Sequence, residues 1–293
     1  MTLLRKISTP ILFLLLLVSG CATDQAGKTP PEVRFAFFGN THPDSPFKSD
    51  RINMNPVITA INEDNPLFLI HLGDIIHGGK EWMGIKQHDV TRQFRSFFML
   101  MPRIRPILYT VKGDLDLFND SAEDYLRFTR RALYYSFNYG NLHILVLDTT
   151  DKKPGEMGSR QKDWMKRDLE RYKNYPAILV ITHHPLFPPE DYTAPEKTRL
   201  KNAQELHNLF RKYPVKAVFS GHMEIYHSEY RNGILYAITG CNYSETREKV
   251  KNYNNDVAYY IVDYTQGLFK IYPKSVSERI IQKKRNPYQY RHM

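Results

Sequence analysis

Short apolar segments alternate with amphipathic ones over most of the chain. The apolar runs predict strands at residues 33–38, 67–72, 107–111, 142–147, 177–181, 217–219, 234–239, 257–263 and 267–272. Segments with apolar residues every three or four positions predict helices at residues 51–63, 87–101, 121–129, 160–172 and 203–213. Ser159 is the expected N-cap of the fourth helix. Regular alternation of strands and helices indicates an α/β domain.

Several predicted strands are apolar at every position, such as Phe35-Ala36-Phe37-Phe38 and Ile178-Leu179-Val180-Ile181. This pattern is typical of strands buried on both faces of a sheet. The last two strands are joined by Thr265-Gln266-Gly267, which predicts a hairpin. In sheets of this class, ligands bind beyond the carboxyl ends of the strands.

Residues of metal-ligand type follow five of the apolar runs. Carboxylates and imidazoles held at strand ends can bind metal ions, and metal ions bring phosphoester chemistry. One such segment alone is more often a turn or a loop, but five in series indicate a metal site. They are Asn40-Thr41-His42, Gly73-Asp74, Gly113-Asp114-Leu115-Asp116, His183-His184-Pro185 and Gly221-His222-Met223-Glu224.

The first residues have the pattern of an export signal. Arg5 and Lys6 precede an apolar stretch at residues 11–18, which is too short to span a membrane. Val18-Ser19-Gly20-Cys21 resembles the lipobox of bacterial lipoproteins, which implies a signal peptide at residues 1–20 and a lipidated, palmitate-bearing Cys21. Ala22 is similar to the pattern for outer-membrane sorting in Gram-negative bacteria, facing the periplasm. The alternative is a secreted protein cut by an ordinary signal peptidase.

Composition and charge indicate the class of protein and the kind of partner. Hydrophobic residues make up 42% and charged residues 25%, as in ordinary globular proteins, and the formal net charge is +10. This charge suits anionic substrates or membranes, but no long basic run with interleaved aromatics occurs, so no nucleic acid is expected. We expect residues 21–32 to form a lipidated tether, residues 33–273 to form one domain, and residues 274–293 to form a basic tail. With Cys21 acylated, Cys241 has no disulfide partner.

The five segments and their flanks resemble the calcineurin-like metallophosphoesterase superfamily, in the branch similar to purple acid phosphatases and cyclic-nucleotide phosphodiesterases. The flanks are Tyr134-Tyr135-Ser136-Phe137, Leu147-Asp148-Thr149 and Gln161-x-x-Trp164. The resemblance implies a four-layer α/β/β/α sandwich of two mixed sheets. It also implies a phosphomonoesterase or phosphodiesterase for small anionic phosphoesters, with two divalent ions roughly 3.5–4 Å apart and a metal-held hydroxide as the nucleophile.

The resemblance also implies the ligands. One metal site would comprise Asn40, His42, Asp74 and Glu224, and the other Asp74, Asp114, His183 and His222, with Asp74 shared. Three positions depart from the family pattern, because Asn40 replaces Asp, Asp114 replaces Asn and Glu224 replaces His. All three retain an oxygen donor, which indicates a rebuilt site. The extra carboxylate of Asp114 in the second site favours Mn, Fe, Mg or Ca over Zn.

Leu115 is the most consequential departure. The family has a catalytic His there, and general acids typically contribute roughly 10²–10⁴-fold. His184, His77 and His227 are candidate substitutes, and His184 and Asp116 are the predicted catalytic residues; the alternative for His184 is packing beside His183. A catalytically inactive lipoprotein that binds metal, phosphate or glycan, and a purely structural envelope lipoprotein, remain alternatives.

Overall fold

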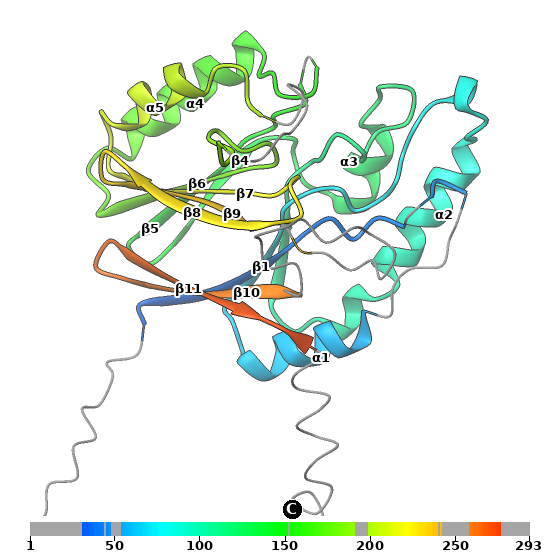
Figure 1. Cartoon of the computed structure of the whole chain (residues 1–293), viewed down its shortest axis with the longest axis horizontal. Helices are drawn as coiled ribbons and strands as arrows, with labels where there is room; N and C mark the ends of the chain where they lie inside the picture. The colour runs from blue at the N-terminus through cyan, green and yellow to red at the C-terminus, as the bar shows by residue number, and fades with distance from the viewer. Residues whose placement is uncertain are drawn as a thin grey trace, which may run out of the picture. The chain divides into compact units, whose positions relative to one another are not determined.

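Two β-sheets pack face to face, with helices on their outer faces (Figure 1). The structure is a computed structural model that describes residues 31–43, 45–47, 54–151, 153–190, 199–239, 241 and 258–276. Cys21, the tether before residue 31 and the tail after residue 276 lie outside the described residues. The predicted four-layer α/β/β/α sandwich of two mixed sheets is confirmed.

The first sheet has five strands in the order β11-β10-β1-β2-β3. β1, β2 and β3 are parallel, while β10 pairs antiparallel with both β1 and β11. The predicted hairpin is present between β10 and β11, where Gln266 and Gly267 adopt φ of 49° and 81° as a two-residue turn requires. The strands are β1 (Val33–Phe38), β2 (Phe68–His71), β3 (Ile107–Thr110), β10 (Tyr259–Thr265) and β11 (Leu268–Lys274).

The second sheet has six strands in the order β4-β5-β6-β7-β9-β8. The four inner strands are mutually parallel, and the two edge strands β4 and β8 pair antiparallel. The pattern of apolar residues did not predict either edge strand. The strands are β4 (Tyr135–Tyr139), β5 (Leu142–Val146), β6 (Ala177–Thr182), β7 (Val215–Ser220), β8 (Tyr226–Arg231) and β9 (Ile234–Thr239).

The helices cover the outer faces of the sheets. Apolar residues of α4 and α5 pack on outward-facing residues of the second sheet, such as Val180 and Val218. Apolar residues of α1 and α2 join the larger core, which also fills the space between the sheets. The helices are α1 (Asn55–Asp64), α2 (Gln87–Phe98), α3 (Glu123–Thr129), α4 (Ser159–Arg171) and α5 (Ala203–Phe210), with short 3₁₀ turns at Glu81–Met83 and Met101–Arg103.

The predicted N-cap of α4 is wrong by one residue. Ser159 is the first helical residue of α4, and Gly158 is at the N-cap position, which has no side-chain hydrogen bond.

None of the helices in the described ranges combines the length and apolar character that crossing a bilayer demands.

Candidate metal centre

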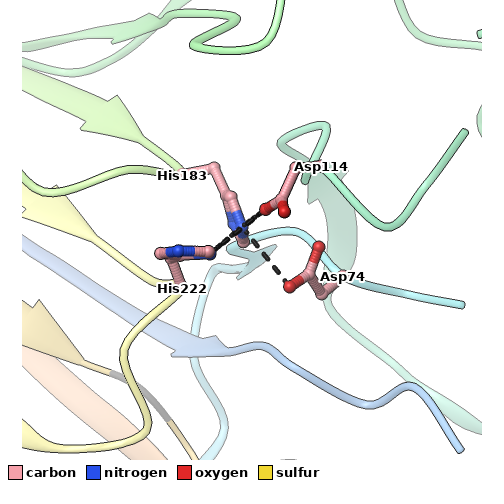
Figure 2. A group of neighbouring side chains, drawn as sticks. All are labelled: Asp74, Asp114, His183 and His222. Atoms are coloured by element: carbon pink, nitrogen blue, oxygen red, sulfur yellow. Dashed lines mark hydrogen bonds and ion pairs between the residues drawn. The ribbon is translucent and has the colours of Figure 1, made fainter. Parts of the chain in front are cut away.

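Four side chains of metal-ligand type converge just beyond four strand ends (Figure 2). Asp74 follows β2 and Asp114 follows β3, while His183 follows β6 and His222 follows β7. One ligand atom from each lies within 4.8 Å of all the others. Each sheet therefore contributes two members of the cluster.

The spacing of these atoms fits one metal ion. His183 Nε2 lies 3.0 Å from Asp114 Oδ1, 3.1 Å from His222 Nδ1 and 3.4 Å from Asp74 Oδ2. Asp114 Oδ1 lies 3.1 Å from His222 Nδ1. Ligands about 2.0–2.2 Å from a shared ion, at tetrahedral or right angles, are about 2.8–3.6 Å apart. These two carboxylates and two imidazoles can therefore share a divalent cation without large rearrangement.

A backbone hydrogen bond orients His183. Its Nδ1 donates to the carbonyl oxygen of Leu72 at 2.6 Å, so its Nε2 points into the cluster. Metal-binding histidines are commonly held this way, because the second nitrogen fixes the tautomer and the direction of the ring. Burial alone would lower the pKa of His183, but Asp74 and Asp114 raise it well above its usual value.

The two carboxylates are stabilised in their charged form. Burial alone would raise the pKa of Asp114, but hydrogen bonds to and charges on His183 and His222 hold it well below its usual value. Burial and the neighbouring Asp114 would raise the pKa of Asp74, but the charge and hydrogen bond of His183, together with the charge of His42, lower it below its usual value. Both residues therefore present negative charge to the cluster.

The loops that present the ligands adopt strained backbone conformations. Asn40, Asp74 and His222 have φ of 52°, 56° and 61°. Residues other than glycine rarely adopt this left-handed region, and it costs of order 1–3 kcal/mol at each position. Such strain clusters at functional sites, so its recurrence at three predicted ligands supports a shared role.

Asp116 lies behind Asp74 and acts as a brace. Its carboxylate is 1% exposed and accepts four backbone N–H groups at 2.7–3.1 Å, from Asp74, Ile75, Ile76 and Gly113. Burial and the charge of Asp74 raise its pKa to about 7, while the four donors favour the carboxylate. The geometry suits a residue that positions Asp74 and Asp114; the predicted catalytic role of Asp116 stays a prediction.

We expect Asp116→Asn to lower the free energy of unfolding by about 3 kcal/mol, because an amide nitrogen would face two N–H groups that now have an acceptor. Urea denaturation measures this change. Asp120→Asn is the matched control: its carboxylate is 74% exposed, pairs with Lys80 at 2.8 Å and should contribute less than about 1 kcal/mol. Equal losses of unfolding free energy in the two variants would contradict a role for Asp116 in holding the ligand loops.

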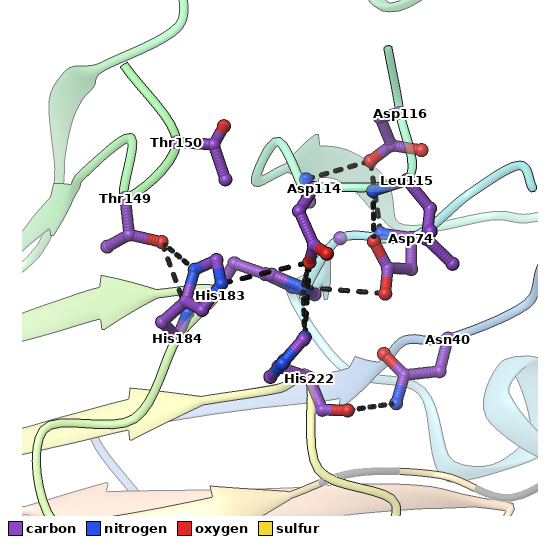
Figure 3. A network of polar contacts seen from close by, with 12 residues as sticks. Asn40, Asp74, Asp114, Leu115, Asp116, Thr149, Thr150, His183, His184 and His222 are labelled. Atoms are coloured by element: carbon purple, nitrogen blue, oxygen red, sulfur yellow. Dashed lines mark hydrogen bonds and ion pairs between the residues drawn. The ribbon is translucent and has the colours of Figure 1, made fainter. Parts of the chain in front are cut away.

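The residues predicted for the other metal site are less closely gathered. His42 lies near enough to Asp74 to lower its pKa, and its Nδ1 donates to the carbonyl of Pro43. Asn40 Nδ2 donates to the carbonyl of His222 at 3.4 Å (Figure 3), and Asn40 Oδ1 is buried without a hydrogen-bond partner in the described ranges. Among described residues, His42, Asp74 and Glu224 do not form a second cluster within 4.8 Å. Their shared site stays a prediction.

The candidate substitutes for the missing catalytic His lie at different places. His184 is fully buried beside the cluster, and burial with the charges of His183 and His222 lowers its pKa to about 3. The ring of His77 lies 5.7 Å from that of His42, and His227 lies on β8. Leu115 donates its backbone N–H to Asp74 Oδ1 at 3.0 Å, so position 115 adjoins the centre.

One buried ion pair near the cluster was not predicted. Lys112 Nζ lies 2.9 Å from Asp148 Oδ2, and both side chains are almost fully buried. Asp148 Oδ1 also accepts the backbone N–H and the hydroxyl of Thr150. The sequence signal was a lysine and an aspartate at the ends of two apolar runs, where a charge needs a buried partner.

The sequence model of the calcineurin-like phosphoesterase family matches residues 33–226. The chain belongs to this family. The matched segment contains all five ligand-bearing motifs in full, which confirms the resemblance stated above. Together with phosphatase relatives, membership supports a phosphoester hydrolase.

Named relatives agree with this assignment. Probable purple acid phosphatase 20 of Arabidopsis thaliana is 32% identical over 97 residues, or 32% of this chain and 22% of that protein. Serine/threonine-protein phosphatase CPPED1 of Rattus norvegicus is 29% identical over 185 residues, or 56% of each. The matches thus span from a fifth to just over half of these relatives. A dimetal phosphatase from Danio rerio has the same fold, with a TM-score of 0.62, 13% identity and coverage of 84% of this chain and 97% of that one.

Proposed function

We propose that the protein is a metal-dependent hydrolase of small anionic phosphoesters, either monoesters or diesters. The observation that carries this proposal is the convergence of Asp74, Asp114, His183 and His222 within 4.8 Å, on the fold of a phosphoesterase family. A divalent ion held there would supply Lewis-acid catalysis and activate water for attack on phosphorus. The net charge of +10 would attract anionic substrates.

The residues of the chain have separate tasks in this proposal. Asp74, Asp114, His183 and His222 would hold one ion, and Asn40, His42 and Glu224, together with Asp74, would hold a second. Among the described residues the buried Oδ1 of Asn40 has no hydrogen-bond partner, which supports this second site because a buried acceptor without a partner is costly. The hydrogen bond that His183 donates to the Leu72 carbonyl, and those that four backbone N–H groups donate to Asp116, keep the ligand side chains in place.

Metal removal and return test the proposal. We expect the mature domain to contain Mn, Fe, Mg, Ca or Zn, to lose its activity toward aryl phosphate mono- or diesters on chelation, and to recover it with one of these ions. The melting temperature should rise with the same ion, because any ligand of the native state stabilises it. A protein that binds metal but hydrolyses no phosphoester would instead support a catalytically inactive binding protein.

Leu115→His tests whether general-acid catalysis is the missing function. Position 115 adjoins Asp74, so an imidazole there could protonate a leaving group. We expect kcat for an alkyl phosphate to rise by about 10²-fold, at the low end of general-acid contributions, and kcat for a nitrophenyl phosphate, which needs no acid, to change little. Leu115→Gln, which adds polarity without an acid, is the control. An equal change for both substrates would contradict this assignment.

We also propose that the protein is anchored to the bacterial envelope through a lipidated Cys21. The support is the lipobox-like segment ending at Cys21, which lies outside the described residues. Labelled palmitate should enter the wild-type protein, and Cys21→Ala should release it from the membrane fraction. Ala22 suggests the outer membrane, facing the periplasm, if the source is Gram-negative. Label retained by the Cys21→Ala variant would refute the assignment.

A further inference from the structure

We propose that His184 is a positioning residue for Asp114: its Nε2–H donates to the Asp114 carboxylate and selects the oxygen that faces the metal centre. This inference rests on the metal centre proposed above. It concerns the position at which this chain carries Asp114 where the family has an asparagine.

The hydrogen bonds of Thr149 determine which ring nitrogen of His184 carries the proton. The backbone N–H of His184 donates to Thr149 Oγ1 at 3.1 Å, and the same Oγ1 lies 2.8 Å from His184 Nδ1. The hydroxyl has one proton, and Nδ1 is its only acceptor among described residues. The hydroxyl therefore donates to Nδ1, and the ring proton is on Nε2.

The Nε2–H of His184 faces Asp114. Figure 3 shows the His184 ring between Thr149 and Asp114, and Nε2 lies 3.8 Å from Asp114 Oδ1. Nε2 is buried and has no hydrogen-bond partner in the described part of the chain. Because a buried N–H without an acceptor typically costs about 1–3 kcal/mol, a shift of about 1 Å that closes this gap is favourable.

Asp114 needs a donor of this kind more than an asparagine would. A carboxylate has two equivalent oxygens and rotates between them, whereas an amide presents only one oxygen. Asp114 Oδ1 already lies 3.0 Å from His183 Nε2 and 3.1 Å from His222 Nδ1, so it is the oxygen that a shared ion would contact. Hydrogen bonds to metal-binding carboxylates typically change metal affinity by about 10–100-fold.

A double-mutant cycle tests this role. His184→Leu and His184→Gln are each made in the wild-type and Asp114→Asn backgrounds, and the Mn²⁺ dissociation constant is measured from the electron paramagnetic resonance signal of free Mn²⁺. We expect His184→Leu to weaken binding by about 10–100-fold in the wild type. His184→Gln, which retains an N–H donor, should recover most of this loss. In the Asp114→Asn background the effect of His184→Leu should fall below about 3-fold.

Two further variants separate positioning from general packing. Thr149→Val removes the hydroxyl that sets the tautomer and should weaken Mn²⁺ binding in the wild type but not beside Asp114→Asn. His207→Leu is the control, because His207 is buried and hydrogen-bonded to Tyr236 and Asn232, outside the metal centre. If the His184→Leu protein does not fold, the test rests on Thr149→Val, compared between the wild-type and Asp114→Asn backgrounds.

The outcomes distinguish the two proposals. Equal losses from His184→Leu or Thr149→Val in both backgrounds, or no loss in either, would overturn the positioning role alone, provided that the wild type binds Mn²⁺ and hydrolyses phosphoesters. A wild type that binds no Mn²⁺ or any other divalent ion would overturn the metal centre and this inference together.

Discussion

Asp74→Asn should reduce phosphoester hydrolysis on the order of 10³-fold or more, or about 4 kcal/mol of transition-state stabilisation. Asparagine has nearly the same shape, and its oxygen can still accept the N–H of Leu115, now 3.0 Å from Asp74 Oδ1. The substitution therefore removes the negative charge of the residue predicted to contact both ions, with little change to the loop. The measurement is kcat/KM for an aryl phosphate, together with the metal-induced rise in melting temperature, which should also disappear.

The matched control is Asp263→Asn, which removes a carboxylate paired with Arg34 at 2.7 Å on the first sheet. Its hydrolysis rate should equal that of the wild type. An Asp74→Asn protein with undiminished turnover would show that the activity belongs to a contaminant or to another site.

Gly73→Ala should destabilise the protein by about 3–5 kcal/mol and abolish metal binding. Gly73 has φ of 98°, which residues with a Cβ rarely adopt, and a Cβ there would lie 2.4 Å from His183 Nδ1 and 2.9 Å from Gly113 N. The His183 ring would have to move, and its bond to the Leu72 carbonyl would break. Urea denaturation of the metal-free protein and a Mn²⁺ titration measure the two effects.

Gly140→Ala is the control for backbone strain alone. Gly140 also has a positive φ, of 52°, but a Cβ there would meet nothing within 4 Å. Gly140→Ala should lower the free energy of unfolding by about 1–2 kcal/mol and leave metal binding unchanged. Similar losses in both glycine variants would mean that the close approach of Gly73 to His183 does not matter.

The sequence predicted the buried elements of the fold better than the exposed ones. β1 and β9 begin and end at the predicted residues, because strands covered on both faces consist mainly of apolar residues. β4 and β8 were missed because they are the edges of the second sheet, where half-buried and exposed positions predominate. Tyr226–Arg231 therefore lacks an apolar run, and its strand forms by pairing with β9.

The site was predictable only as far as position along the chain determines position in space. Strand-end placement anticipated the meeting of Asp74, Asp114, His183 and His222, which the structure brings together. It gave no means of separating side chains that face the cluster from side chains that support it. Asp116 accepts four backbone N–H groups, and Thr149 is hydrogen-bonded to both the backbone N–H and the Nδ1 of His184. These roles depend on hydrogen bonds between loops distant in sequence, which no local pattern encodes.

The division of the four converging side chains between the sheets has a mechanical consequence. Asp74 and Asp114 extend from one layer, and His183 and His222 from the other, so a cation bound by all four would be a cross-link between the two halves of the sandwich. Sliding of one layer over the other would then require coordination bonds to break. Amide protons of β2 and β6 should accordingly exchange with solvent more slowly, and to a similar degree, when that cation is present.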